Sequence, residues 1–139
     1  MLRFAWIVAL TALVAAPLAA ETAIPDVRGT WKGESESIVL GTGHPHHPAA
    51  QPNEPQFRSV AFTLTIDRQD GRRFSGTFSS ARSSENVIAV ISRSGAILLA
   101  DDEGYTHGIM LGPNRMELCY LHVSSTARIA SCVELTKQQ

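Results

Sequence analysis

The feature that most constrains the fold is a repeated alternation of apolar and polar residues in short segments. In residues 60–67, VAFTLTID, every second side chain is large and apolar. Comparable short segments follow at residues 74–78, 87–92, 96–100, 105–111, 115–123 and 128–136, with turn-forming residues between them, and residues 21–139 show no helical periodicity. Alternation with a period of two is typical of strands with one buried face. The sequence therefore predicts an all-β fold.

The number of segments favours a closed architecture. Residues 28–40 add one bent strand, which brings the total to eight. Eight antiparallel strands joined in chain order can close into an up-and-down barrel, which has no exposed edge and can hold one small ligand. We therefore predict an eight-stranded antiparallel barrel, with an open β-sandwich of the same strands as the alternative.

Strand direction assigns the two ends of this barrel. A three-residue turn at 69–71 would give Gly71 a left-handed conformation and would pair Ile66 with Phe74 and Phe62 with Phe78. If strand 28–40 starts at the base, the loops 41–57, 80–86, 101–104 and 124–127 gather at the opposite end, where we expect the functional site. The base is then expected to be closed by Trp31 with Ile66, Phe74, Leu111, Met116 and Leu135.

The N-terminus predicts export. Met1 to Arg3 give a positive start, an apolar stretch follows, and Ala19-Ala20 supply the small residues of a cleavage site. We interpret residues 1–20 as a cleaved signal peptide and residues 21–139 as one domain in the periplasm or outside the cell. The apolar stretch is shorter than the roughly 20 residues that span a bilayer, and the sequence has no second candidate, so we expect no membrane span in the mature chain.

The two cysteines fit this interpretation. If residues 124–127 form a four-residue hairpin loop, Cys119 lies directly opposite Cys132. Cysteines of exported proteins are usually oxidised, and the pair lacks the CxxC spacing of redox catalysts. We predict a disulfide between them.

Overall charge excludes one class of partner. The chain has 12 Lys and Arg against 13 Asp and Glu, a formal net charge of −1. Nucleic-acid binders carry a basic patch or stripe, so we expect no nucleic-acid partner. The sequence does not indicate an oligomeric state.

A short motif adds a family resemblance. Gly29-Thr30-Trp31, followed by Gly33, resembles the Gly-x-Trp opening strand of the lipocalin and avidin barrels, the calycin group. The match covers about six residues, and the second lipocalin motif is not found. The resemblance implies an eight-stranded barrel with a ligand at its mouth. The whole chain also resembles small exported bacterial proteins of no established function, which implies no activity.

A candidate ligand site follows from the predicted strand pairing. Pairing Leu111 with Met116 directs several polar side chains of neighbouring strands toward the inside of the barrel near its open end. Polar groups that converge on an apolar concave site are typical of small-molecule pockets; alternatively, these groups satisfy one another as a rim network without a ligand. The predicted ligand-binding residues are Tyr105, His107, Tyr120, His122 and Ser131.

A second candidate site is the Pro- and His-rich loop 41–57. It contains His44, His46 and His47, whose imidazoles could bind copper, zinc or nickel with a third ligand from His107, His122 or Glu54. The alternative is a solvated loop whose histidines only titrate near neutral pH. A divalent metal ion is the one cofactor that the sequence suggests.

Two further functional classes are enzymes, which catalytic motifs would indicate, and inhibitors, which need a segment that can insert into another protein. No Gly-x-Ser-x-Gly elbow, HExxH motif or phosphate-binding glycine loop occurs, so we expect a non-enzymatic binding protein. A second hypothesis is an inhibitor that inserts residues 21–27 or 41–57 into another protein. We expect Asp101, Asp102 and Glu103 to be exposed turn residues without a ligand role.

Overall fold

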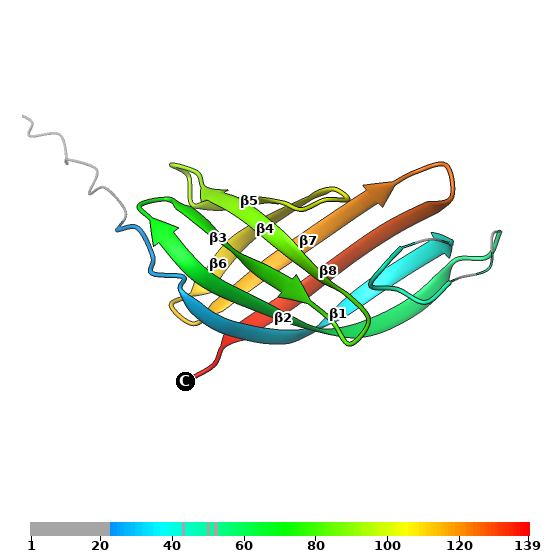
Figure 1. The fold of residues 1–139 in the computed structure, drawn as a ribbon, viewed down its shortest axis with the longest axis horizontal. Helices are drawn as coiled ribbons and strands as arrows, with labels where there is room; N and C mark the ends of the chain where they lie inside the picture. Colours follow the sequence, from blue (N-terminus) through cyan, green and yellow to red (C-terminus); the bar gives the residue numbers. More distant parts are fainter. Residues whose placement is uncertain (1–22, 43, 50, 52) are drawn as a thin grey trace, which may run out of the picture.

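The computed structural model describes residues 23–42, 44–49, 51 and 53–139, and the predicted signal peptide lies outside them. The described residues form eight antiparallel strands that close into one barrel in chain order, with β1 paired to both β2 and β8 (Figure 1). The predicted barrel is therefore confirmed, and the open sandwich is wrong. The strands are β1 (Gly29–Gly41), β2 (Gln56–Asp70), β3 (Arg73–Ser79), β4 (Ser84–Ile91), β5 (Ala96–Ala100), β6 (Tyr105–Gly112), β7 (Arg115–Val123) and β8 (Ala127–Lys137).

The core lies at the base of the barrel, where β1 begins and the chain ends (Figure 1). Trp31 is completely buried, and its indole Nε1 donates a hydrogen bond to the Val27 carbonyl at 2.8 Å. The segment before β1 thus returns over the base, and Val27 joins the same core. Of the predicted base residues, Ile66, Phe74, Met116 and Leu135 are in this core, whereas Leu111 is 42% exposed.

The turn between β2 and β3 differs from the predicted one. Asp70 pairs with Arg73, so the turn has two residues, and Gly71 has the expected left-handed conformation at φ 56°. The register shifts between Ile66 and Arg68. This bulge adds one residue to β2 and places Ile66 opposite Gly76 instead of Phe74. The side chains of Ile66 and Phe74 both still face the core.

The predicted pairing of Phe62 with Phe78 is also wrong, because Leu64 lies opposite Phe78. The two aromatic rings nevertheless stack, with centroids 4.7 Å apart. Diagonal neighbours on one face of a sheet are within reach of aromatic side chains. This aromatic pair forms part of the wall above the base core.

The hairpin of β7 and β8 has the predicted register. Val123 pairs with Arg128 and Cys119 with Cys132, and the two cysteines form a disulfide. The predicted disulfide is confirmed. Disulfides persist in oxidising compartments, so this bond fits a periplasmic or extracellular protein.

Helices long and apolar enough to cross a membrane are not found in the part of the chain that the structure describes.

We expect reduction of the disulfide to lower the free energy of unfolding by roughly 3 kcal/mol, because a cross-link restricts the unfolded chain. The bond joins residues 13 apart in the sequence. Urea unfolding with and without a reductant measures the difference. A Cys119→Ala, Cys132→Ala double variant is the control and should not respond to the reductant. An equal urea midpoint for the oxidised and reduced wild type would contradict the prediction.

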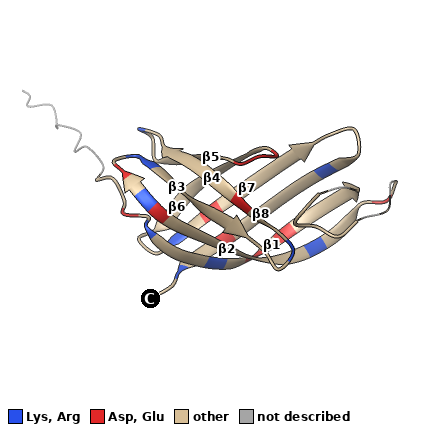
Figure 2. Cartoon of the chain, in the orientation of Figure 1, with Lys and Arg blue, Asp and Glu red and all other residues tan. Residues whose placement is uncertain are grey.

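One side of the barrel exterior lacks charge. Neither β5 nor β6 contains Asp, Glu, Lys or Arg, and Figure 2 shows both strands free of charged residues. Ile88 on β4 and Leu98 on β5 are 69% and 48% exposed. The charges of the barrel wall are therefore carried by the other strands and by the turns.

Candidate functional site

The site lies at the end of the barrel opposite the core, where the connection between β1 and β2 turns inward. We call residues 44–48 of this connection the histidine plug. His44, His46 and His47 are only 9%, 4% and 3% exposed. The connection is tied to the rim by a hydrogen bond of 2.9 Å from the Thr42 amide to the Thr126 carbonyl. The alternative of solvated histidines is therefore wrong, although residues 48–49 and 53–55 of the connection are exposed.

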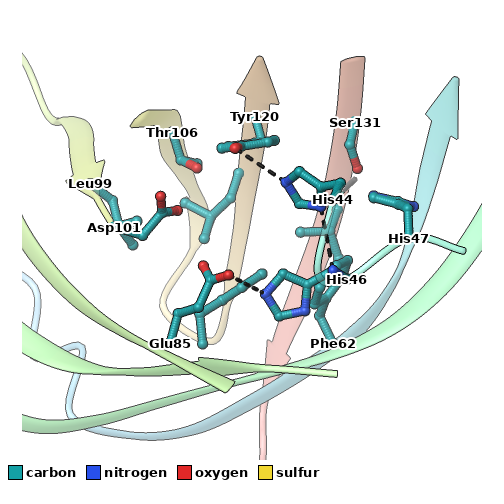
Figure 3. Close-up of a pocket in the computed structure, with 13 residues that line it drawn as sticks. His44, His46, His47, Phe62, Glu85, Leu99, Asp101, Thr106, Tyr120 and Ser131 are labelled. Carbon is teal, nitrogen blue, oxygen red and sulfur yellow. Dashed lines mark hydrogen bonds and ion pairs between the residues drawn. The ribbon is translucent and has the colours of Figure 1, made fainter. Parts of the chain in front are cut away.

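His46 is held by polar groups and aromatic rings. Its Nδ1 is 2.8 Å from the Ser80 hydroxyl, and its ring packs edge-on against Phe62 with centroids 5.2 Å apart. Its Nε2 lies 3.3 Å from Glu85 Oε1, within ion-pair distance but not aligned for a hydrogen bond (Figure 3). His46 thereby fastens the plug to β4 and to the turn before it.

His44 connects the plug to β7. Its Nε2 is 3.3 Å from the Tyr120 hydroxyl, and the same hydroxyl is 3.2 Å from Nδ1 of His122. The rings of His44 and His122 meet edge-on with centroids 5.2 Å apart. Three aromatic side chains from two distant segments therefore form one chain of contacts across the rim.

Burial controls the protonation of these groups. It lowers the pKa of all three plug histidines, that of His44 to about 4, because the charged imidazolium loses its hydration. Burial also raises the pKa of Glu85 to about 7, with a further increase from Asp101, Glu103 and Asp102. The His46–Glu85 contact is thus better described as a neutral pair than as a salt bridge. Near pH 7 the plug histidines are uncharged, with acids near His44, His46 and Glu85 and the positive charge of Arg58 near His47.

Tyr120 has the same surroundings. Burial raises the pKa of its hydroxyl, and the charges of Asp101, Glu103 and Glu85 raise it further. The hydroxyl therefore keeps its proton at neutral pH and serves as a donor as well as an acceptor between the two imidazoles. These shifts also show that the negative potential of the turn 101–103 extends into the mouth.

The structure places two predicted ligand residues outside the barrel. Tyr105 is 68% exposed, and His107, which pairs with Cys119, is also exposed on the outer face. The predicted pairing of Leu111 with Met116 is wrong because the register shifts between Met110 and Gly112, so that Met110 lies opposite Met116. A register shift of one residue turns the side chains of β6 on the far side of the bulge from the turn, including Tyr105 and His107, to the opposite face of the sheet.

The other three predicted residues lie at the mouth, although their ligand role remains a prediction. Tyr120 and His122 belong to the contact chain described above. Ser131 on β8 faces the pocket (Figure 3). Its hydroxyl is 2.7 Å from that of Ser37 on β1. The predicted inward side of β7 and β8 is therefore right.

The predicted metal ligands separate into different surroundings. His44 lies beside His122 and Glu103, whereas His46 is directed to Ser80 and Glu85. Within the described ranges, His46 and His47 do not form a three-ligand group with His44. His107 cannot contribute, because it lies on the outer face.

Between the plug and the barrel wall is a small pocket. It leaves about 40 Å³ for the centres of water molecules, and roughly 10–15 Å³ of such space holds one water. The pocket thus accommodates a few waters or a small ion while the plug is in place. The lining combines the plug histidines with apolar and polar residues of the wall: Phe62, Phe78, Glu85, Leu99, Asp101, Thr106, Leu118, Tyr120, Ser131 and Val133.

Several of these residues were not predicted. Glu85 is a lone acidic residue in a polar stretch of sequence, and nothing near it in the chain indicates that its side chain faces inward. Thr106 turns inward only because of the β6 bulge. Asp101 and Glu103 were recognised as turn acids at the correct end, but their proximity to the plug depends on where the plug folds.

Comparisons with known proteins assign no family to this chain. No protein-family model matches the chain, and no curated protein matches it. Among solved structures, the S-type phycobiliprotein lyase CPES from Guillardia theta is similar to this chain, with a TM-score of 0.38 and 11% sequence identity, over 81% of this chain and 89% of that chain. Membership of the calycin group therefore stays a prediction.

The expectation of a non-enzymatic protein is corrected by this comparison, because the similar structure is named as a lyase. That expectation was based on the absence of hydrolase, zinc-protease and nucleotide-binding motifs. The absence of these motifs does not exclude catalysis by a barrel. The likeness itself assigns no activity to this chain.

Proposed function

We propose that this chain is an exported binding protein whose barrel mouth takes a small cation beneath the histidine plug. The observation that carries the proposal is a pair of buried imidazole nitrogens inside an acidic pocket. Nδ1 of His47 has no hydrogen-bond partner among the described residues, and Nε2 of His46 has only the misaligned 3.3 Å contact with Glu85. Buried polar atoms are nearly always paired in folded proteins, so a bound group that satisfies them is a direct explanation.

The charges around the pocket favour a positive group. The plug histidines are neutral near pH 7, whereas Asp101 lines the pocket and Asp102 and Glu103 are close enough to raise the pKa of Glu85. Charges at a partly buried site interact more strongly than in water. A cation would therefore gain from the acids and from the imidazole lone pairs together.

The shape of the pocket supports the same assignment. Apolar residues of the wall line the pocket together with the polar groups of the plug and rim (Figure 3). This combination excludes bulk water and orients a ligand. The calycin resemblance also implies a ligand at this end. Because the plug histidines are buried in their own barrel, the inhibitor hypothesis loses residues 44–48 as a segment for insertion into a partner.

A titration followed by NMR tests the proposal. Methylammonium and Zn²⁺ serve as cation probes, and formate serves as a small anion. We expect at least one cation to shift the resonances of the plug histidines and Tyr120, and formate to leave them unchanged. Asp101→Asn should weaken cation binding about tenfold, equivalent to ~1.4 kcal/mol, because it removes one negative charge at the pocket.

Asp67→Asn is the matched control, since it removes an equal charge from an exposed position on the outer face of β2. The side-chain amide introduced by Asp101→Asn keeps an oxygen that can accept the hydrogen bonds from the Glu103 and Gly104 amides, so the turn is preserved. Mouth resonances that respond to formate as strongly as to both cations, or to none of the probes, would disprove the proposed function.

A further inference from the structure

We infer that the cation held at this mouth is a divalent transition-metal ion bound by His44, Glu103 and His122. This inference rests on the proposed function, that a cation binds at the mouth, and places the ion at His44 beside the pocket, with two residues that do not line the pocket. One ligand atom from each of the three side chains lies within 4.8 Å of the other two. Two imidazoles and a carboxylate form a ligand set suited to Zn²⁺ and related ions.

The geometry requires only small movements. Metal–ligand bonds of about 2.0–2.1 Å place the ligand atoms of a tetrahedral site about 3.4 Å apart, so the three side chains must approach one another by about an ångström. Glu103 is exposed and His122 is half-buried, so both have room to rotate. The wall supplies no competing thiolate, because Cys119 and Cys132 are joined in the disulfide.

The two imidazoles are already oriented toward a common point. The Tyr120 hydroxyl contacts both rings, at 3.3 Å for His44 and 3.2 Å for His122. The two contacts lie at or just beyond the long end of the 2.7–3.2 Å range for hydrogen bonds between nitrogen and oxygen, so exchanging one of them for a metal bond costs little. Tyr120 is thus a positioning residue for the site.

The three ligands come from three separate parts of the chain. His44 belongs to the plug, Glu103 to the turn between β5 and β6, and His122 to β7. A bound ion would therefore cross-link the plug to the barrel wall. Three protein ligands leave a fourth tetrahedral position for water or another small donor, as in sites that exchange ligands.

Isothermal titration of untagged protein with Zn²⁺ at pH 7.5 tests this inference. We expect one ion per chain, and at least tenfold weaker binding for Glu103→Gln and for His122→Ala. Glu103→Gln is the decisive variant, because the side chain is exposed and its change should leave the fold intact. Saturating Zn²⁺ should also raise the unfolding temperature of the wild type, because the ion binds only the folded site.

Two matched controls separate a specific site from general loss of histidine or charge. His107→Ala removes an imidazole from the outer face, and Asp67→Asn removes an acid from an exposed position on the outer face of β2. Both should bind Zn²⁺ with wild-type affinity.

Three results would overturn the inference. They are no Zn²⁺ binding, unchanged affinity in Glu103→Gln, or loss of binding in His46→Ala and His47→Ala but not in His122→Ala. If Zn²⁺ fails to bind but methylammonium occupies the pocket, the metal inference falls and the proposed function stands. If neither cation binds, both fall.

Discussion

A Trp31→Ala variant is expected to lose about 3–5 kcal/mol of unfolding free energy, the range for removal of a large buried aromatic side chain. Trp31 is completely buried among the side chains of the base core. The variant also removes the hydrogen bond to the Val27 carbonyl. Because domains of this size are stabilised by only about 5–15 kcal/mol, much of the total would be lost.

Urea unfolding followed by circular dichroism measures this effect without depending on tryptophan fluorescence. Phe57→Ala is the matched control, since Phe57 is a large aromatic residue on β2 that is 84% exposed. We expect its unfolding free energy to stay within about 0.5 kcal/mol of the wild type. Similar losses in the two variants would show that Trp31 does not close the base as described.

The second large effect is expected on acidification. Burial lowers the pKa of His44, His46 and His47 below the ordinary value of 6.5, that of His44 to about 4. Between these values the unfolded chain binds more protons than the folded chain, so stability falls as the pH falls. The full contribution of the histidines is present above pH 6.5 and is lost progressively toward pH 4.

Glu85 acts in the opposite direction. Its folded pKa of about 7 lies above the ordinary value of 4.5, so its contribution to stability decreases as the pH rises from 4.5 to 7. Three histidines outweigh one carboxyl group, and the wild type should therefore lose stability on acidification. Glu85→Gln removes the opposing contribution and should make that loss steeper.

Unfolding free energies between pH 4.5 and 7.5 provide the measurement. A variant with glutamine at 44, 46 and 47 is the comparison, because glutamine does not titrate and keeps hydrogen-bonding groups. We expect its stability to depend much less on pH in this interval. Equal slopes for this variant and the wild type would contradict the buried state of the plug.

The physical reason that the fold was predictable is the local nature of its signals. Alternation in residues 60–67 reports which face of a strand is buried, and the four residues 124–127 fix the register that sets Cys119 opposite Cys132. Glycine at position 71 marks a turn that needs a left-handed residue. Each of these features depends on neighbours close in the sequence, and each was anticipated.

The candidate site was only partly predictable. His44, Tyr120 and His122 were singled out, but under two separate hypotheses, a metal loop and a ligand mouth. Their contact through the Tyr120 hydroxyl unites them. Tyr105 and His107 were assigned to the inside, because a bulge that inserts one residue leaves no clear pattern in the sequence.

The sequence by itself determined the all-β class, the eight strands, their order and the disulfide, because these follow from a period of two and from short turns. Only the tertiary structure decided that the histidine plug enters the barrel, and that Glu85 and Glu103 stand beside it. The reason is that burial of a loop is decided by the space and partners that distant strands provide after the barrel closes. A local sequence pattern therefore does not indicate whether a loop will be buried.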